Sequence, residues 1–287
     1  MKDLIVMIPT YNAEKYIATS INSIKNQNEN INLLVVDNQS TDSTVEILKN
    51  EGIDFVVNDK NLGRIGNWNK CLDIFEDSEF KWLQFCFMGD ELSENYSQEI
   101  SHVIENLENS VTTISWPYRF NDNKNKISKS PSKFNSDCIK SYEEVIIEIG
   151  AGNYLGAIIS VLLSKESIKN NRFDEEFIGI SLFYDRALTT GNTYYLNKPI
   201  TQFNQNSHKT FALSLSEHGI FEKVYLRSYL NEKYKNLLGE KNYEEMKKNI
   251  FADFIQDLMY VELFKLSLIA KKYIKKVVNK IKQLIKS

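Results

Sequence analysis

The stretch LIVMIPTYN, residues 4–12, decides the fold that we expect, because five consecutive apolar residues precede a proline and a polar turn. Such a run is typical of a strand that is buried on both faces, as in a parallel sheet. Comparable runs recur at residues 32–37, 54–57 and 81–87. Segments with apolar residues at helical spacing separate these runs, so the sequence predicts an α/β domain with a Rossmann-like, mostly parallel sheet flanked by helices.

Each helix predicted between these strands has one apolar face. We expect Asn12 to cap the first helix and the second helix to start near Ser40 and Thr41, because these residue types favour helix N-termini. The inward-facing residues would be Ile17, Ile21 and Ile24 in the first helix, Val45, Ile47 and Leu48 in the second, and Trp68, Leu72 and Phe75 in the third.

Three polar stretches follow the predicted strands and mark the expected binding site. They are PTYN at 9–12, DNQSTD at 37–42 and MGDE at 88–91. In parallel sheets, ligands bind outside the carboxyl ends of the strands, and these stretches would meet there. Within the second stretch, we interpret Ser40 and Asp42 as helix-capping residues.

Asp90 and Glu91 are adjacent carboxylates that come soon after the fourth apolar run. Oxygen ligands suit Mg²⁺ and Mn²⁺, which are commonly held by one or two carboxylates together with substrate phosphate and water. A second interpretation places both residues in the first turn of a helix, where the helix dipole favours negative charge. The local sequence leaves both interpretations open.

Apolar and polar segments also alternate in the second half of the chain. Residues 118–140 are rich in lysine and serine and predict a long loop. Buried structure is expected again at 152–163, residues 173–186 lead from FDEEF into a helix, and residues 192–203 predict a pair of strands. Helical segments are expected from about residue 215 to the end of the chain.

Positive charge is concentrated near the C-terminus, where residues 264–287 carry eight lysines and no acid although the whole chain has a net charge of −3. On a helical wheel, apolar residues gather on one side of this segment and lysines on the other. It could be a helix packed on the protein with a solvated lysine face, or a helix that lies on an anionic membrane surface. Nucleic acid is disfavoured as a partner, because no arginines cluster there and the rest of the chain is acidic.

The three cysteines are well separated and form no CxxC or Cys/His pattern, so neither a disulfide framework nor a structural zinc site is predicted. No apolar run reaches membrane-spanning length, and the N-terminal run is too short for a signal peptide. We therefore expect a cytoplasmic protein, either soluble or peripheral on the inner face of the cytoplasmic membrane.

Several motifs occur in a fixed order along residues 3–210: IPTYNAEKYIATSINSIKNQ, LLVVDNQSTDST, NLGRIGNWNKCLD, FMGDEL, GNYLGAIISVLLSKESI and YYLNKPITQFNQNSH. This ordered set resembles the family 2 glycosyltransferases, which have the GT-A fold. The resemblance implies a GT-A domain over residues 1–210, with a nucleotide-sugar-binding half at 1–115 and an acceptor-binding half at 116–210. Residues 211–287 would form a helical extension that ends in the basic helix.

The resemblance also implies a divalent cation, Mn²⁺ or Mg²⁺, on the diphosphate of the donor. In the family, the nucleotide base packs near the residue that matches Tyr11, and carboxylates that match Asp90 and Glu91 contact the ribose and the metal. The implied donor-binding residues are Pro9, Thr10, Tyr11, Glu14, Asp37, Asn38, Arg64 and Asp90, and the implied metal ligands are Asp90, Glu91 and His208.

Three positions in these motifs depart from the family pattern. Asn38 stands where the family most often has an aspartate that reads the imide N–H of uracil, and an asparagine carbonyl can accept the same hydrogen bond. Met88 replaces the first aspartate of the family's Asp-x-Asp-Asp motif, and Glu91, which is longer than aspartate, stands at its last position.

The catalytic base is not identified by the motifs. In relatives it is an aspartate about six residues before an arginine, and counting back from Arg186 gives Ile180, which is no carboxylate. An inverting transfer needs a carboxylate to accept the proton of the attacking hydroxyl. The candidates, in order, are Asp185, Glu176 and Glu175.

The function that we expect is metal-dependent, inverting transfer of a sugar from a nucleotide-sugar, with UDP as the preferred nucleotide, to a hydroxyl of a glycan or lipid-linked glycan. Surface polysaccharides such as lipopolysaccharide or capsule would be the products. The alternative is a catalytically impaired subunit of the same fold that binds or scaffolds, which Met88 and Ile180 motivate. A nucleotidyltransferase is disfavoured, because no glycine-rich phosphate-binding loop follows the first strand.

Overall fold

The computed structural model describes most of the first 204 residues and short stretches near residue 240. The described residues are 1–121, 127–129, 134–150, 159–173, 183, 186–204, 228, 231–232, 234–236, 238–241 and 243–251. Contacts between Cα atoms divide the chain into two compact units, Met1–Lys209 and Thr210–Ser287. In the second unit, residues 243–251 are helical.

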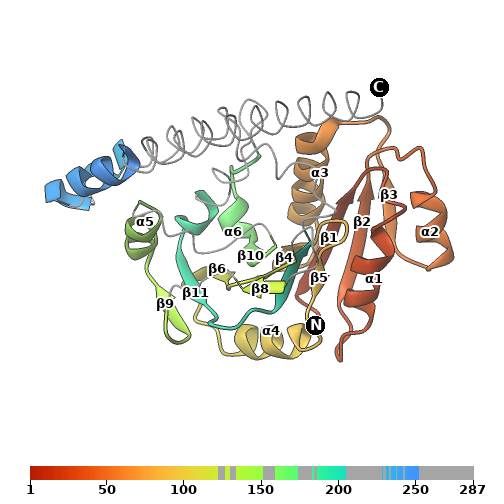
Figure 1. Ribbon diagram of the computed structural model, residues 1–287, viewed down its shortest axis with the longest axis horizontal. Coiled ribbons are helices and arrows are strands. Elements are labelled where there is room, and N and C mark those ends of the chain that lie inside the picture. Colours follow the sequence, from red (N-terminus) through yellow and green to blue (C-terminus); the bar gives the residue numbers. More distant parts are fainter. Residues whose placement is uncertain are drawn as a thin grey trace, which may run out of the picture. The chain divides into compact units, whose positions relative to one another are not determined.

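The first unit is built on an eight-stranded sheet with the strand order β3-β2-β1-β4-β10-β6-β11-β9 (Figure 1). The first four strands in this order are mutually parallel, and β11 is parallel to β6. β10 runs antiparallel to both of its neighbours, as does β9 to β11. Their bounds are β1 Leu4–Thr10, β2 Asn32–Asp37, β3 Phe55–Val57, β4 Trp82–Phe85, β6 Val111–Ser115, β9 Cys138–Lys140, β10 Val161–Ser164 and β11 Asn192–Tyr195.

Helices cover both faces of the parallel part, which explains why β1 is buried along its whole length. Leu4, Val6 and Ile8 belong to one buried cluster with the apolar face of α1, and the alternate residues of a strand point to the other face, where α3 packs against β1 and β2. The predicted α/β architecture is confirmed. The helices are α1 Ile17–Lys25, α2 Thr44–Asn50, α3 Gly63–Asp77, α4 Tyr96–Glu105, α5 Tyr142–Gly150 and α6 Lys165–Ile168.

The predicted helix starts are wrong for the first two helices. α1 begins at Ile17 with Tyr16 as its N-cap, and α2 begins at Thr44 with Ser43 as its N-cap. The reason is that Asn12 and Ser40 use their side chains to join the two loops to each other, so neither is available to a helix terminus.

A second, four-stranded sheet has the order β5-β12-β7-β8, with β5 Glu91–Leu92, β7 Arg119–Asn121, β8 Ile127–Lys129 and β12 Thr201–Asn204. The loop predicted over residues 118–140 is therefore wrong in part, because this segment contributes β7, β8 and β9. This sheet is mixed, because β12 runs antiparallel to β5 and parallel to β7, and β7 runs antiparallel to β8. Its strands are only two to four residues long and have no continuous apolar run, so they leave no clear strand pattern in the sequence. The strands predicted over 192–203 both form, but β11 joins the large sheet and β12 the small one.

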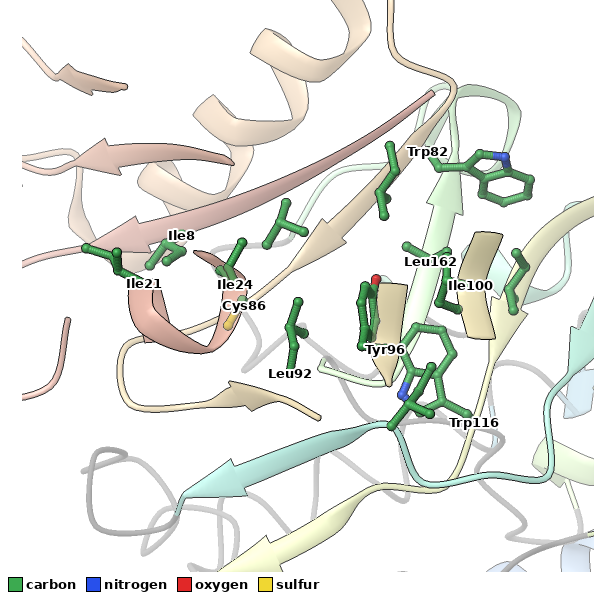
Figure 2. Close-up of a cluster of buried hydrophobic side chains, with 14 of the residues drawn as sticks. Ile8, Ile21, Ile24, Trp82, Cys86, Leu92, Tyr96, Ile100, Trp116 and Leu162 are labelled. Atoms are coloured by element: carbon green, nitrogen blue, oxygen red, sulfur yellow. The ribbon is translucent and has the colours of Figure 1, made fainter. Parts of the chain in front are cut away.

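A buried cluster connects the two sheets and is drawn in Figure 2. The rings of Tyr96 and Trp116 lie 6.1 Å apart at 69°, and the indole N–H of Trp116 donates to Thr201 Oγ1 at 3.0 Å. Cys86 and Leu92 lie in the same cluster, on either side of the turn that carries Asp90. The core therefore fixes the end of β4, β5 and β12 together. Among the described residues, no helix has the length and apolar character needed to cross a membrane.

Candidate functional site

The three polar stretches singled out in the sequence meet at one edge of the large sheet. β1 lies between β2 and β4, all three are parallel, and Thr10 is in register with Asp37. The N–H of Asn38 donates to Thr10 O at 2.9 Å beyond the last ladder pair, and the N–H of Cys86 donates to Met7 O at 3.0 Å. The carboxyl ends of these strands thus form a common rim, as predicted.

The loops after β1 and β2 are locked together by reciprocal hydrogen bonds. Three successive backbone N–H groups of the first loop donate to side chains of the second: Asn12 to Ser40 Oγ (2.8 Å), Ala13 to Thr44 Oγ1 (2.7 Å) and Glu14 to Asp42 Oδ2 (3.1 Å). In return, N–H groups of the second loop donate to the first: Thr41 to Asn12 Oδ1 (2.8 Å) and Ser43 to Glu14 Oε2 (3.2 Å). Glu14 and Asp42 therefore hold the loops together.

Two residues in these loops have left-handed backbone conformations. Asn12 has a φ of 50° and Gln39 a φ of 60°, values that residues with a side chain rarely adopt. Partial burial alone would raise the pKa of Asp42, but hydrogen bonds from Thr44 and from the Glu14 N–H hold it below its usual value. Tyr11, in the first of these loops, is 42% exposed and so is open to a ligand.

Asp37 and Asn38 are both buried at the end of β2. The Asp37 carboxylate accepts the N–H of Ser40 at 2.9 Å and the Ser40 hydroxyl, so it closes the turn that begins the second loop. Ser40 acts on these loops and not as a helix cap, whereas Asp42 accepts the first N–H of α2, that of Thr44, at 3.0 Å.

The side chain of Asn38 makes four hydrogen bonds within the protein. Its Nδ2 donates to Asn61 Oδ1 at 2.9 Å and to Gly63 O at 3.1 Å. Its Oδ1 accepts from Asn58 Nδ2 at 3.1 Å and from the Leu62 N–H at 2.8 Å. Because an asparagine amide has two donor hydrogens and two acceptor lone pairs, all of its capacity is used. The backbone partners at Leu62 and Gly63 also fix which way the amide points.

Arg64 stands in the first turn of α3, with its guanidinium 5.3 Å from the centre of the Trp68 ring. Trp68 in turn contacts Phe87 at 5.1 Å and Phe173 at 5.2 Å between ring centres. These aromatic contacts connect α3 to the end of β4 and to the start of the segment that bears two of the candidate bases.

The motif FMGDEL forms a tight turn after β4 and not the start of a helix. Gly89 has a φ of 86°, Asp90 donates its N–H to Phe87 O at 2.9 Å, and Glu91 begins β5. The hydroxyl of Ser20 on α1 accepts the Gly89 N–H and donates to Asp90 O. α4 starts only at Tyr96, so the interpretation that the two carboxylates occupy a helix first turn is wrong.

Both carboxylates of this motif are held by β12. Asp90 is fully buried and its Oδ1 accepts the N–H of Asn204 at 2.9 Å. Glu91 is half-buried and its Oε1 accepts from Gln202 Nε2 at 3.0 Å. Burial and the charge of Asp90 raise the pKa of Glu91 above its usual value, although the Gln202 hydrogen bond opposes this. A divalent cation would relieve that electrostatic cost.

The donor set fits a cation that is shared with a substrate. Within the described part of the chain, no group of three histidine, cysteine, aspartate or glutamate residues is gathered closely enough to hold a metal alone. Asp90 and Glu91 supply carboxylate oxygens, and Mg²⁺ or Mn²⁺ is commonly bound by one or two carboxylates plus phosphate and water. His208 lies outside the described residues. It follows Asn204 by four positions, so an extended chain would let it reach at most about 14 Å from there.

The candidate bases Glu175, Glu176 and Asp185 also lie outside the described residues. The chain on either side of the segment 174–182 is firmly anchored. Asn69 on α3 accepts the N–H of Phe173 at 2.9 Å and donates to its carbonyl at 3.0 Å. The rings of Phe173 and Phe183 stack with centres 4.0 Å apart, so this segment leaves and rejoins the fold at one place.

Comparisons with proteins of known sequence agree with this architecture. A family model described as "Glycosyl transferase family 2" matches residues 5–155, more than half of the chain. The minor teichoic acid biosynthesis protein GgaB of Bacillus subtilis is 28% identical over 181 residues, which are 60% of this chain and 19% of GgaB. An uncharacterized glycosyltransferase of Methanocaldococcus jannaschii, MJ1057, is 27% identical over 182 residues, 60% of this chain and 59% of that protein. The match thus spans less than two thirds of either relative.

Solved structures support the predicted GT-A fold. S. aureus TarS 1–349 in complex with UDP-GlcNAc superposes with a TM-score of 0.58 at 18% identity, over 89% of this chain and 81% of that one. The mannosyltransferase PcManGT of Pyrobaculum calidifontis, in complex with GDP-Man and Mn²⁺, gives a TM-score of 0.54 at 13% identity, over 92% of this chain and 80% of that one. The fold and the resemblance seen in the sequence are both confirmed. The chain belongs to glycosyl transferase family 2.

Proposed function

We propose that this protein transfers a sugar from a nucleotide-sugar to a hydroxyl of a glycan or lipid-linked glycan in surface-polysaccharide synthesis. The observation that carries the proposal is the common rim of β1, β2 and β4, which brings the exposed Tyr11 and the carboxylates Asp90 and Glu91 to one edge of the sheet. Residues 1–115 would hold the donor and residues 116–210 the acceptor. The relation to GgaB supports a surface glycan as the product.

For the donor, we propose a UDP-sugar whose base stacks on Tyr11, with Arg64 on the base or the diphosphate. TarS, a structure of the same fold, binds UDP and UDP-GlcNAc. Asn38 was expected to read the base, but its side-chain amide already makes four hydrogen bonds within the protein. We therefore do not assign it a contact with the base. Asn38 would instead position the residues that lead into α3.

For the cofactor, we propose Mn²⁺ or Mg²⁺ held by Asp90 and Glu91, with His208 as a further ligand. PcManGT, which shares the fold, was solved with Mn²⁺. When bound, such a cation offsets the charge that develops on the departing diphosphate. The protein's own part is to hold both carboxylates in place through β12.

The base would be Asp185, Glu176 or Glu175, taking the proton of the acceptor hydroxyl as it attacks the anomeric carbon from the side opposite the diphosphate. The anchoring of Phe173 by Asn69 supports the two glutamates, since they follow Phe173 within three residues.

We also propose that residues 264–287, which lie outside the described residues, bind the anionic inner face of the cytoplasmic membrane. Eight lysines and no acid in an amphipathic pattern support this, because each lysine near such a surface contributes about 1 kcal/mol.

A panel of nucleotide-sugars tested by thermal shift with and without Mn²⁺ checks the proposed function. At about 100 times its dissociation constant, the true donor should add about 2.7 kcal/mol to the free energy of unfolding. That gain corresponds to a rise in Tm of about 5–10 °C. We expect the rise for UDP-sugars in the presence of Mn²⁺ and a smaller one without it, and absence of any shift across the panel would refute donor binding.

An assay of sugar transfer distinguishes an active enzyme from a subunit that only binds or scaffolds. Met88 stands at the position of the family's first aspartate, and its side chain packs against the core cluster. Because this position holds no carboxylate, a protein that has lost catalytic activity is the second candidate function. Metal-stimulated release of UDP from a UDP-sugar by the purified protein would exclude that candidate, and donor binding without any release would support it.

Tyr11→Ala should weaken UDP binding roughly 10- to 100-fold, because stacking of a base on an aromatic side chain contributes about 1–3 kcal/mol. Isothermal titration with UDP measures the change. Tyr11→Phe keeps the ring and should bind like the unaltered protein, and Tyr142→Ala removes a tyrosine of similar exposure on α5. Equal UDP affinity of Tyr11→Ala and Tyr142→Ala would show that the base does not use Tyr11.

A further inference from the structure

β12 holds the two carboxylates of the motif by two different kinds of hydrogen bond. Asp90 receives its bond from a backbone group, the Asn204 N–H, whereas Glu91 receives its bond from a side chain, the Gln202 amide. Gln202 is in register with Glu91 in the antiparallel β12–β5 pair, so the two side chains stand directly opposite each other. Only the bond to Glu91 can therefore be removed by a side-chain substitution.

The position of β12 does not depend on Gln202. Thr201 next to it is fully buried and accepts the indole N–H of Trp116 at 3.0 Å. Ile200 is fully buried in the same cluster, and its carbonyl accepts the Ser93 N–H at 2.9 Å. Because these anchors come before Gln202 in the strand, the loss of its amide should leave the strand in place.

The side chain of Glu91 needs such a partner more than an aspartate would. It has one more rotatable bond than aspartate, and fixing a glutamate side chain costs up to about 1.5–2 kcal/mol of rotamer entropy. A hydrogen bond to Oε1 fixes the plane of the carboxylate and so the direction of Oε2. Groups that orient a metal ligand in this way typically change metal affinity about 10- to 100-fold.

We propose that Gln202 is a positioning residue that orients the Glu91 carboxylate toward the divalent cation, an assignment that rests on the proposed function. Gln202 touches neither substrate nor reacting atoms in this role and acts through Glu91. β12 also carries Asn204, whose N–H binds Asp90, so this one strand holds both carboxylates of the motif.

Gln202→Met, which keeps the length of the side chain and removes the donor, tests the assignment. Mn²⁺ binding is measured by electron paramagnetic resonance in the presence of UDP, and UDP binding is measured separately without metal. We expect Mn²⁺ affinity to fall about 10-fold or more, with the metal-free UDP affinity and the Tm unchanged. Gln98→Met, an exposed glutamine on α4, is the matched control and should change none of these.

A double-mutant cycle with Glu91→Gln shows whether the two residues act together. In the Glu91→Gln background, Gln202→Met should cause no further loss of Mn²⁺ affinity. Additive losses, or unchanged Mn²⁺ affinity in Gln202→Met, would overturn the positioning role while leaving the proposed function intact. An unaltered protein that binds no UDP under any condition would overturn the proposed function and this assignment with it.

Discussion

Replacing Asp90 by asparagine should reduce sugar transfer by about 10³-fold, a loss of about 4 kcal/mol of transition-state stabilisation. Asp90 is fully buried, and its carboxylate is the charge that the fold encloses most completely in the motif. Asparagine has nearly the same shape and can still accept the Asn204 N–H through Oδ1, so the turn and β12 should stay in place. What disappears is one of the two negative charges that would hold the divalent cation.

Release of UDP from the best donor of the thermal-shift panel is the measurement, because it needs no knowledge of the acceptor. Asp54→Asn, which neutralises an exposed carboxylate just before β3, is the matched control and should keep full activity. If Asp90→Asn retained a tenth or more of the metal-stimulated rate, Asp90 would have a purely structural role, and the metal would have to bind elsewhere.

The strands of the parallel sheet could be predicted from the sequence because burial on both faces leaves a local signal. β2 matches the predicted range of 32–37, and β1 covers the predicted run and extends to Thr10. The carboxyl ends of adjacent parallel strands must meet at one edge, so the location of the site followed from the strands alone. Local pattern was sufficient for this part of the fold.

Partners that are distant in the sequence could not be predicted in the same way. Asn12 and Ser40 were predicted to cap helices, since the residue types that cap helices are also those that join loops through side-chain hydrogen bonds. Which role they take depends on a contact across 28 residues or more. Gln202 and Glu91 are separated by 111 residues, and nothing local marks either as the partner of the other.

The second large effect is expected at Asn38, where aspartate would restore the residue that the family most often has. In this protein, Asn38→Asp should lower the free energy of unfolding by at least about 3 kcal/mol. The new carboxylate cannot donate to Asn61 Oδ1 or to Gly63 O, so these two acceptors would face a buried negative oxygen. Each lost hydrogen bond contributes about 1 kcal/mol, and burying a carboxylate that faces two acceptors costs more.

Thermal unfolding should show this as a fall in Tm of about 6–12 °C, with no gain in UDP affinity. Asn28→Asp makes the same chemical change at an exposed position and should leave Tm nearly constant. A stable Asn38→Asp protein that binds UDP more tightly would mean that residue 38 reads the uracil imide after all. If instead the variant is destabilised, the difference from the family pattern is structural. The amide is then required because Asn61 Oδ1 and Gly63 O both accept from residue 38, and the proposed recognition of the base rests on Tyr11.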